Sequence, residues 1–160
     1  MALIWLPMLL LGGADWVPAT PIGDLACVFH HPVVEVDTFR RLPRPIVKFM
    51  LAQFPPDEIL VMKGGMAERG ELFNMSDAIT DRNAPTARFI RGGRSGHRWF
   101  LMYEHGGRPY FKNGAVFSLK KGETVPHLIG QAAYEDENPC LLTDQILDGR
   151  NPRAGSEPLW

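Results

Sequence analysis

The chain has 160 residues and nearly balanced charge, with 17 Lys and Arg against 18 Asp and Glu. This length predicts one domain with a substantial hydrophobic core. The balanced charge argues against a dedicated nucleic-acid-binding protein, because such proteins usually carry a basic excess on one face. The 16 glycines and 14 prolines predict many turns.

The N-terminal stretch bears on the compartment in which the protein is found. Residues 1–13, MALIWLPMLLLGG, are a short apolar run that ends in small residues. Such a run has the length of a signal-peptide core and is too short to span a bilayer. No Lys or Arg precedes it, so a buried N-terminal strand or helix is the alternative. We expect a signal peptide over 1–19, one globular domain over 20–150 and a flexible tail over 151–160, in a periplasmic or secreted protein without a stable membrane span after cleavage.

The two cysteines, Cys27 and Cys140, lack the spacing of a redox or zinc motif. In an oxidising compartment, two cysteines in one small domain most simply pair with each other. We therefore predict a disulfide between them, which would stabilise the fold by roughly 4–5 kcal/mol on the chain-entropy model. Two unpaired buried thiols are the alternative if the protein is not exported.

The clearest predicted helix covers residues 45–54, PIVKFMLAQF. It begins with a proline, which suits the first helical position, and two prolines follow it and end it. Ile46, Met50 and Phe54 repeat on one face, so this face should pack on a core. A shorter helix is expected near the C-terminus in CLLTDQIL, ended by Gly149.

The connection between residues 57 and 85 shows no period that separates helix from strand. A long, glycine-punctuated connection inside a small domain is either functional or disordered. Its triplet Asn74-Met75-Ser76 matches the N-glycosylation sequon, which matters only in a eukaryotic secretory pathway.

From Thr86 onward, alternating apolar residues and glycine-containing turns predict antiparallel strands. Asn113-Gly114 interrupts this pattern and indicates either a hairpin turn or a bulge within one strand. We expect an α+β fold, in which the core helix packs on an antiparallel four-stranded meander beside a short C-terminal helix. The expected strands are 86–94, 97–105, 109–119 and 125–134.

The stretch GRSGHRWFLMYEHGGRPYF, residues 93–111, carries two histidines and a glutamate around an aromatic centre. Side chains alternate along a regular strand, so Glu104 and His105 should point to opposite faces and cannot act as an adjacent acid–base pair without a bulge. The favoured interpretation is a central strand whose polar ends emerge near the turns. His105, Glu104 and His97 are the catalytic candidates that this stretch offers.

Other chemical motifs are missing from the sequence. It contains no Gly-x-Ser-x-Gly, no phosphate-binding glycine loop and no histidine spacing typical of metal sites. We therefore expect no metal site and no cofactor. Arg91, Arg94 and Arg98 are the candidates for a ligand-binding basic patch.

These observations favour an exported, non-enzymatic protein that binds a protein, a small ligand or an envelope component, with no nucleic-acid partner. The alternative is a small exported hydrolase or lyase. It would use His105 or His97 with a carboxylate from Asp77, Asp81 or Glu104. A deep pocket that unites a histidine with a carboxylate would favour the enzyme, and scattered histidines on a flat sheet would favour the binding protein.

Overall fold

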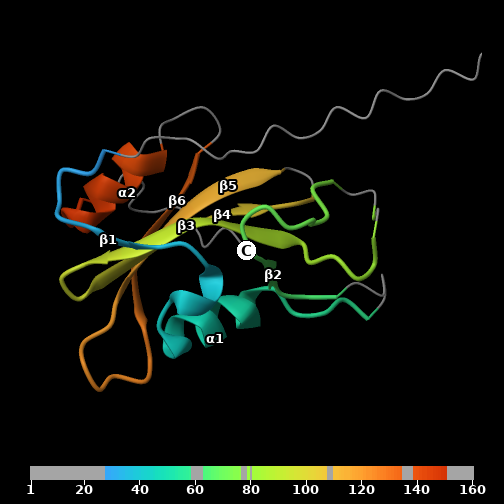
Figure 1. Ribbon diagram of the computed structural model, residues 1–160, viewed down its shortest axis with the longest axis horizontal. Helices are drawn as coiled ribbons and strands as arrows, with labels where there is room; N and C mark the ends of the chain where they lie inside the picture. Colours follow the sequence, from blue (N-terminus) through green and yellow to red (C-terminus); the bar gives the residue numbers. More distant parts are fainter. Residues whose placement is uncertain are drawn as a thin grey trace, which may run out of the picture.

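The computed structural model describes residues 28–58, 63–76, 79, 81–107, 110–134 and 139–150. These residues form one six-stranded sheet, with helix α1 (Arg44–Gln53) against one face and helix α2 (Pro139–Leu147) against the other (Figure 1). This confirms the α+β class. The expected signal peptide and the expected C-terminal tail lie outside the described residues.

The sheet has the order β1-β3-β4-β5-β6, and β2 also pairs with β3. Its four long strands pair antiparallel with their chain neighbours, whereas β2 runs parallel to β3. The sheet is larger than the sequence predicts, because the two extra strands are too short to show a period. The strands are β1 (Val34–Val36), β2 (Met66–Ala67), β3 (Ala87–Ser95), β4 (Arg98–His105), β5 (Phe111–Ser118) and β6 (His127–Tyr134).

Helix α1 packs one side of the sheet together with the short 3-10 helix η1 (Phe39–Arg41). Ile46 and Met50 are fully buried in a cluster that includes Leu101 and Phe117 from the sheet. The helix ends one residue earlier than predicted. Phe54 takes a non-helical backbone because the residue before a proline is pushed away from the helical region.

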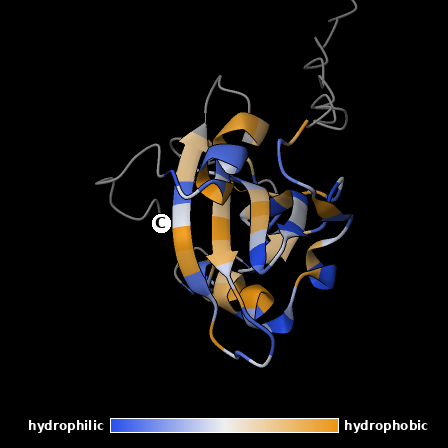
Figure 2. Cartoon of the chain, turned by 90° about the vertical axis from the view of Figure 1, so that its left-hand side faces the viewer, coloured by the Kyte–Doolittle hydropathy of each residue, from blue (hydrophilic) through white to orange (hydrophobic). Residues whose placement is uncertain are grey.

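Helix α2 covers the opposite side of the sheet, on a cluster that includes Phe100, Met102, Val116 and Ile146. Alternation along β4 and β5 sends successive side chains to these two clusters. Figure 2 shows hydrophobic residues along the middle of the strands and hydrophilic residues near their ends. Gly149, at φ +83°, follows the helix as predicted.

The Asn113-Gly114 pair is neither a turn nor a bulge. Both residues lie inside β5, and its pairing with β4 runs without interruption from Phe111 to Ser118. The register between β5 and β6 shifts further on, between Val116 and Phe117, and the pairing of β5 with β4 does not share this shift. The strand therefore tolerates two residues that usually avoid strand interiors.

Candidate functional site

A pocket of about 440 Å³ lies between the end of α1 and the end of β4. We call it the His105 pocket. Its volume falls within the range of small-molecule sites. Of the described histidines, His105 alone lines it, and the residues that matter below are Phe54, Asp57, Thr86, His105 and Gly106.

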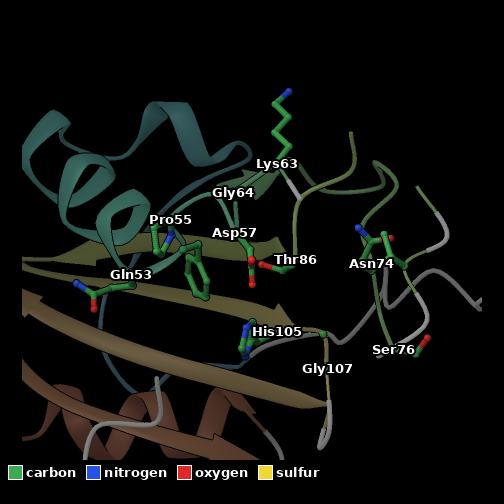
Figure 3. Close-up of a pocket in the computed structure, with 13 residues that line it drawn as sticks. Gln53, Pro55, Asp57, Lys63, Gly64, Asn74, Ser76, Thr86, His105 and Gly107 are labelled. Carbon is green, nitrogen blue, oxygen red and sulfur yellow. The ribbon is translucent and has the colours of Figure 1, made fainter. Parts of the chain in front are cut away.

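Three polar side chains meet in this pocket. Figure 3 shows the carboxylate of Asp57 directed toward Thr86, with His105 beside them on its strand, whereas Lys63 extends away. The ring of His105 packs against Phe54 at a centroid distance of 5.3 Å. Burial lowers the pKa of His105, so its imidazole is neutral near pH 7. The pocket thus presents a carboxylate, a hydroxyl and a neutral imidazole.

The wall of the pocket depends on close contact between two backbones. A Cβ on Gly106 would lie 1.7 Å from the carbonyl oxygen of Asn74, so only glycine fits there. The Gly106 N–H also donates to the carbonyl oxygen of Thr86 at 2.8 Å. These contacts hold the loop before β3 against the end of β4.

Asn74, the asparagine of the predicted sequon, has a structural role in the folded protein. Its side chain is buried, and its Nδ2 donates to the carbonyl oxygens of Asp81 at 2.8 Å and Ala84 at 2.9 Å. The Asp81 N–H donates back to Asn74 Oδ1 at 3.2 Å. In the folded protein this amide therefore braces the loop that carries Thr86.

Glu104 lies on the opposite face of the sheet from His105, and it is only 1% exposed. The expectation that it emerges toward solvent is wrong. Arg88 stands directly across from it on β3 and donates from Nη2 to Oε2 at 2.8 Å, so the carboxylate is satisfied inside the protein. The same pair adjoins Tyr110, whose pKa is raised by burial and by the Glu104 charge.

Two of the remaining catalytic candidates, His97 and Asp81, do not line the pocket. His97 is exposed in the turn between β3 and β4. The carboxylate of Asp81 accepts the N–H of Asn83 at 2.8 Å, and Asp77 lies outside the described residues. Among the described carboxylates, Asp57 lines the pocket together with His105. Sequence reasoning missed it because its connection carries no periodic pattern.

The three candidate arginines contact three different groups. Arg91 pairs with Glu35 at 2.9 Å, Arg94 lies 6.0 Å from the Trp99 ring centre, and Arg98 donates to the carbonyl oxygen of Leu147.

A second polar group lies on the α1 side of the sheet, and we call it the buried amide row. It consists of Tyr103, Asn113 and Gln131, on the neighbouring strands β4, β5 and β6. Gln131 Nε2 donates to the Tyr103 hydroxyl at 3.2 Å. The other amide atoms, Nδ2 and Oδ1 of Asn113 and Oε1 of Gln131, are buried and have no hydrogen-bond partner.

Cys140 is 1% exposed in the first turn of α2, and Cys27 lies outside the described residues, so the disulfide stays a prediction. Within the described ranges, no three His, Cys, Asp or Glu side chains are grouped so that they could hold a metal ion. Neither helix in the described part of the chain combines the length and apolar character that a membrane span needs. Comparison with family models, with curated proteins and with solved structures gives no match.

Proposed function

We propose that this protein binds a small polar ligand in the His105 pocket without transforming it. The observation that supports this proposal is that Asp57, Thr86 and His105 line one pocket of about 440 Å³. A concave, partly apolar space with a few convergent polar groups is the usual form of a small-ligand site. The aromatic ring of Phe54 supplies an apolar wall.

The charges favour a ligand with a donor group. Asp57 carries the negative charge that points inward, and the exposed Lys63 points away from it (Figure 3). The neutral imidazole of His105 adds no opposing positive charge near pH 7. A protonated amine therefore complements the pocket better than a carboxylate does.

A fragment screen by ligand-observed NMR tests this proposal, with small amines, amides and carboxylates as probes. We expect amines to bind and to shift the backbone resonances of Thr86 and His105. Asp57→Asn should weaken them about tenfold, which is about 1.4 kcal/mol. Asp37→Asn is the matched control, because Asp37 is an exposed carboxylate that pairs with Arg41. If no fragment shifts Thr86 or His105, the proposal fails.

A hydrolase or lyase is the second candidate, because His105 and Asp57 line one pocket. A neutral imidazole near pH 7 is suited to accept a proton as a general base. Incubation with chromogenic esters would distinguish the two candidates. Turnover that His105→Gln abolishes would favour the enzyme, and binding of fragments without turnover would favour the binding protein.

We also propose that the protein is exported and that Cys27 pairs with Cys140. The apolar N-terminal run supports export. The chain just after Cys27 runs along α2: the backbone N–H of His30 donates to the Asp144 carboxylate at 3.1 Å, and Asp144 lies one helical turn beyond Cys140. This proximity favours the pairing.

N-terminal sequencing of protein from its native host tests export, with a start after Ala14 or Ala19 as the expected result. An intact Met1 would contradict it. For the disulfide, thiol titration of the unfolded, unreduced protein should find no free cysteine. Two free thiols in protein from an oxidising compartment would refute the pairing.

A further inference from the structure

We propose that a second pocket, at the β1 edge of the sheet, binds the phosphate group of a small soluble phosphate monoester. We call it the arginine pocket. It has a volume of about 240 Å³, and its charged lining residues are Glu35, Asp37, Arg41, Arg69 and Arg91. It shares none of its described lining residues with the His105 pocket. The inference therefore goes beyond the ligand site proposed above and does not rest on it.

The arginine pocket lies at an interruption in the edge of the sheet. Strand β4 pairs with β3 along its full length, so β1 and β2 must both pair with the other edge of β3. On that edge, β1 covers residues 92–94 and β2 covers residues 87–88 (Figure 1). In the described ladders, residues 89–91 pair with neither of these two strands. Ile90 and Arg91, which belong to this gap, line the pocket.

A β-bulge in the gap decides the direction of Arg91. Phe89 and Arg91 lie across from two consecutive residues of β4, Tyr103 and Met102, so Ile90 is an extra residue in β3. Arg91 therefore shares the α2 face with Met102, and Ile90 packs on this face as well. In a regular strand, Arg91 would follow Phe89 onto the α1 face. Bulges are common next to active sites because they change the direction of a side chain in this way.

The arginine pocket brings together three guanidinium groups from three segments. Arg41 comes from η1, Arg69 from the chain after β2, and Arg91 from β3. Carboxylates orient two of them: Arg41 Nη1 lies 3.0 Å from Asp37 Oδ1, and Arg91 Nε lies 2.9 Å from Glu35 Oε2. A guanidinium has five N–H donors, so a carboxylate can orient it while further donors meet a ligand. Three positive charges against two negative ones leave the lining positive.

The size and charge of the arginine pocket favour a phosphate group. Its volume lies below the range of about 300–1,000 Å³ that is usual for drug-sized ligands, so it suits a small anionic group. A phosphate monoester carries a charge of about −1.5 to −2 near pH 7 and offers three acceptor oxygens, which matches three guanidinium groups. A carboxylate carries one charge on two oxygens. The pocket should therefore prefer phosphate monoesters over carboxylates.

A titration with methyl phosphate at constant ionic strength, followed through the backbone amide signals of Ile90 and Arg91, tests the inference. Acetate is the comparison probe. We expect methyl phosphate to shift both signals to saturation and to bind at least about tenfold more tightly than acetate. This measurement on the unaltered protein needs no variant to fold.

Vesicles that contain phosphatidic acid distinguish a soluble ligand from a lipid headgroup, because they present the same phosphate chemistry on a membrane surface. We expect the protein not to sediment with these vesicles. Sedimentation with the vesicles in the absence of methyl phosphate binding would overturn the assignment of a soluble ligand.

Three variants then separate recognition by the arginine pocket from general attraction of anions. Arg69→Gln and Arg91→Gln should each weaken methyl phosphate binding about tenfold or more. Arg94→Gln is the matched control, because Arg94 lies on the same strand as Arg91 but contacts the Trp99 ring and does not line the pocket. This control should leave the binding of methyl phosphate unchanged.

Three further results would overturn the inference. They are unshifted signals of Ile90 and Arg91, equal binding of acetate and methyl phosphate, and a loss of binding in Arg94→Gln as large as in Arg91→Gln. The outcome for the His105 pocket is read separately, since Thr86 and His105 line that pocket and not this one. Shifts of Ile90 and Arg91 by methyl phosphate would therefore support the arginine pocket even if no fragment reached His105.

Discussion

The same strands form both faces of the sheet, but the two faces differ in whether their buried polar groups have hydrogen-bond partners. On the α2 face, the buried carboxylate of Glu104 has a full partner in Arg88. On the α1 face, the buried amides of Asn113 and Gln131 keep atoms that form no hydrogen bond within the protein. The α2 face also leaves an unpaired atom, the Thr143 hydroxyl, but that atom stands alone. The two faces therefore differ in how far their described buried polar groups find partners within the protein.

Breaking the ion pair on the α2 face should have the largest effect. Glu104→Ala leaves Arg88 without its buried partner, and we expect a loss of about 3–5 kcal/mol in the free energy of unfolding. Urea denaturation measures it. Glu35→Ala is the matched control, since Glu35 forms a more exposed pair with Arg91 and should cost no more than about 1 kcal/mol. Equal losses in the two variants would show that burial of the pair does not matter.

Crowding the wall of the His105 pocket should have the next largest effect. Gly106→Ala pushes a Cβ into the carbonyl oxygen of Asn74, and overpacking of this kind costs about 1–3 kcal/mol. NMR spectra should show displaced Asn74 side-chain amide signals. In Gly107→Ala the new Cβ meets no atom within 4 Å, although φ is +116°, so these signals should stay in place. Undisturbed Asn74 signals in Gly106→Ala would contradict the contact.

The titration of His105 should give the smallest effect. Burial lowers its folded-state pKa, so between this value and the unfolded value of about 6.5 only the unfolded chain binds the proton. The free energy of unfolding should therefore fall as the pH falls through this window, and His105 should add no further change below its folded pKa. Denaturation series across this range, with His105→Gln as the reference, measure the difference. A larger stability of the wild type at the acidic end would reverse the sign.

Local patterns in the sequence determined much of the scaffold. Proline and glycine signals place both helices to within about one residue, because these residues restrict or free the backbone by themselves. Alternation along β4 also places Glu104 and His105 on opposite faces, since successive side chains of a strand always diverge. The class of the fold follows from such short-range rules.

Only the tertiary structure decided which polar groups meet. Arg88 satisfies Glu104 because the register of β3 against β4 places them opposite each other, and no local pattern specifies that register. Asp57 lines the His105 pocket from a connection without periodicity. Asn113, which the sequence pattern assigned to a turn or a bulge, is a buried amide inside β5 that forms no hydrogen bond within the protein. Backbone preferences and the alternation of side chains act over a few residues. The burial of a side chain and the identity of its partners depend on distant segments of the chain. The α+β class and the approximate bounds of the helices could therefore be predicted from the sequence, whereas the two additional strands and the candidate site could not.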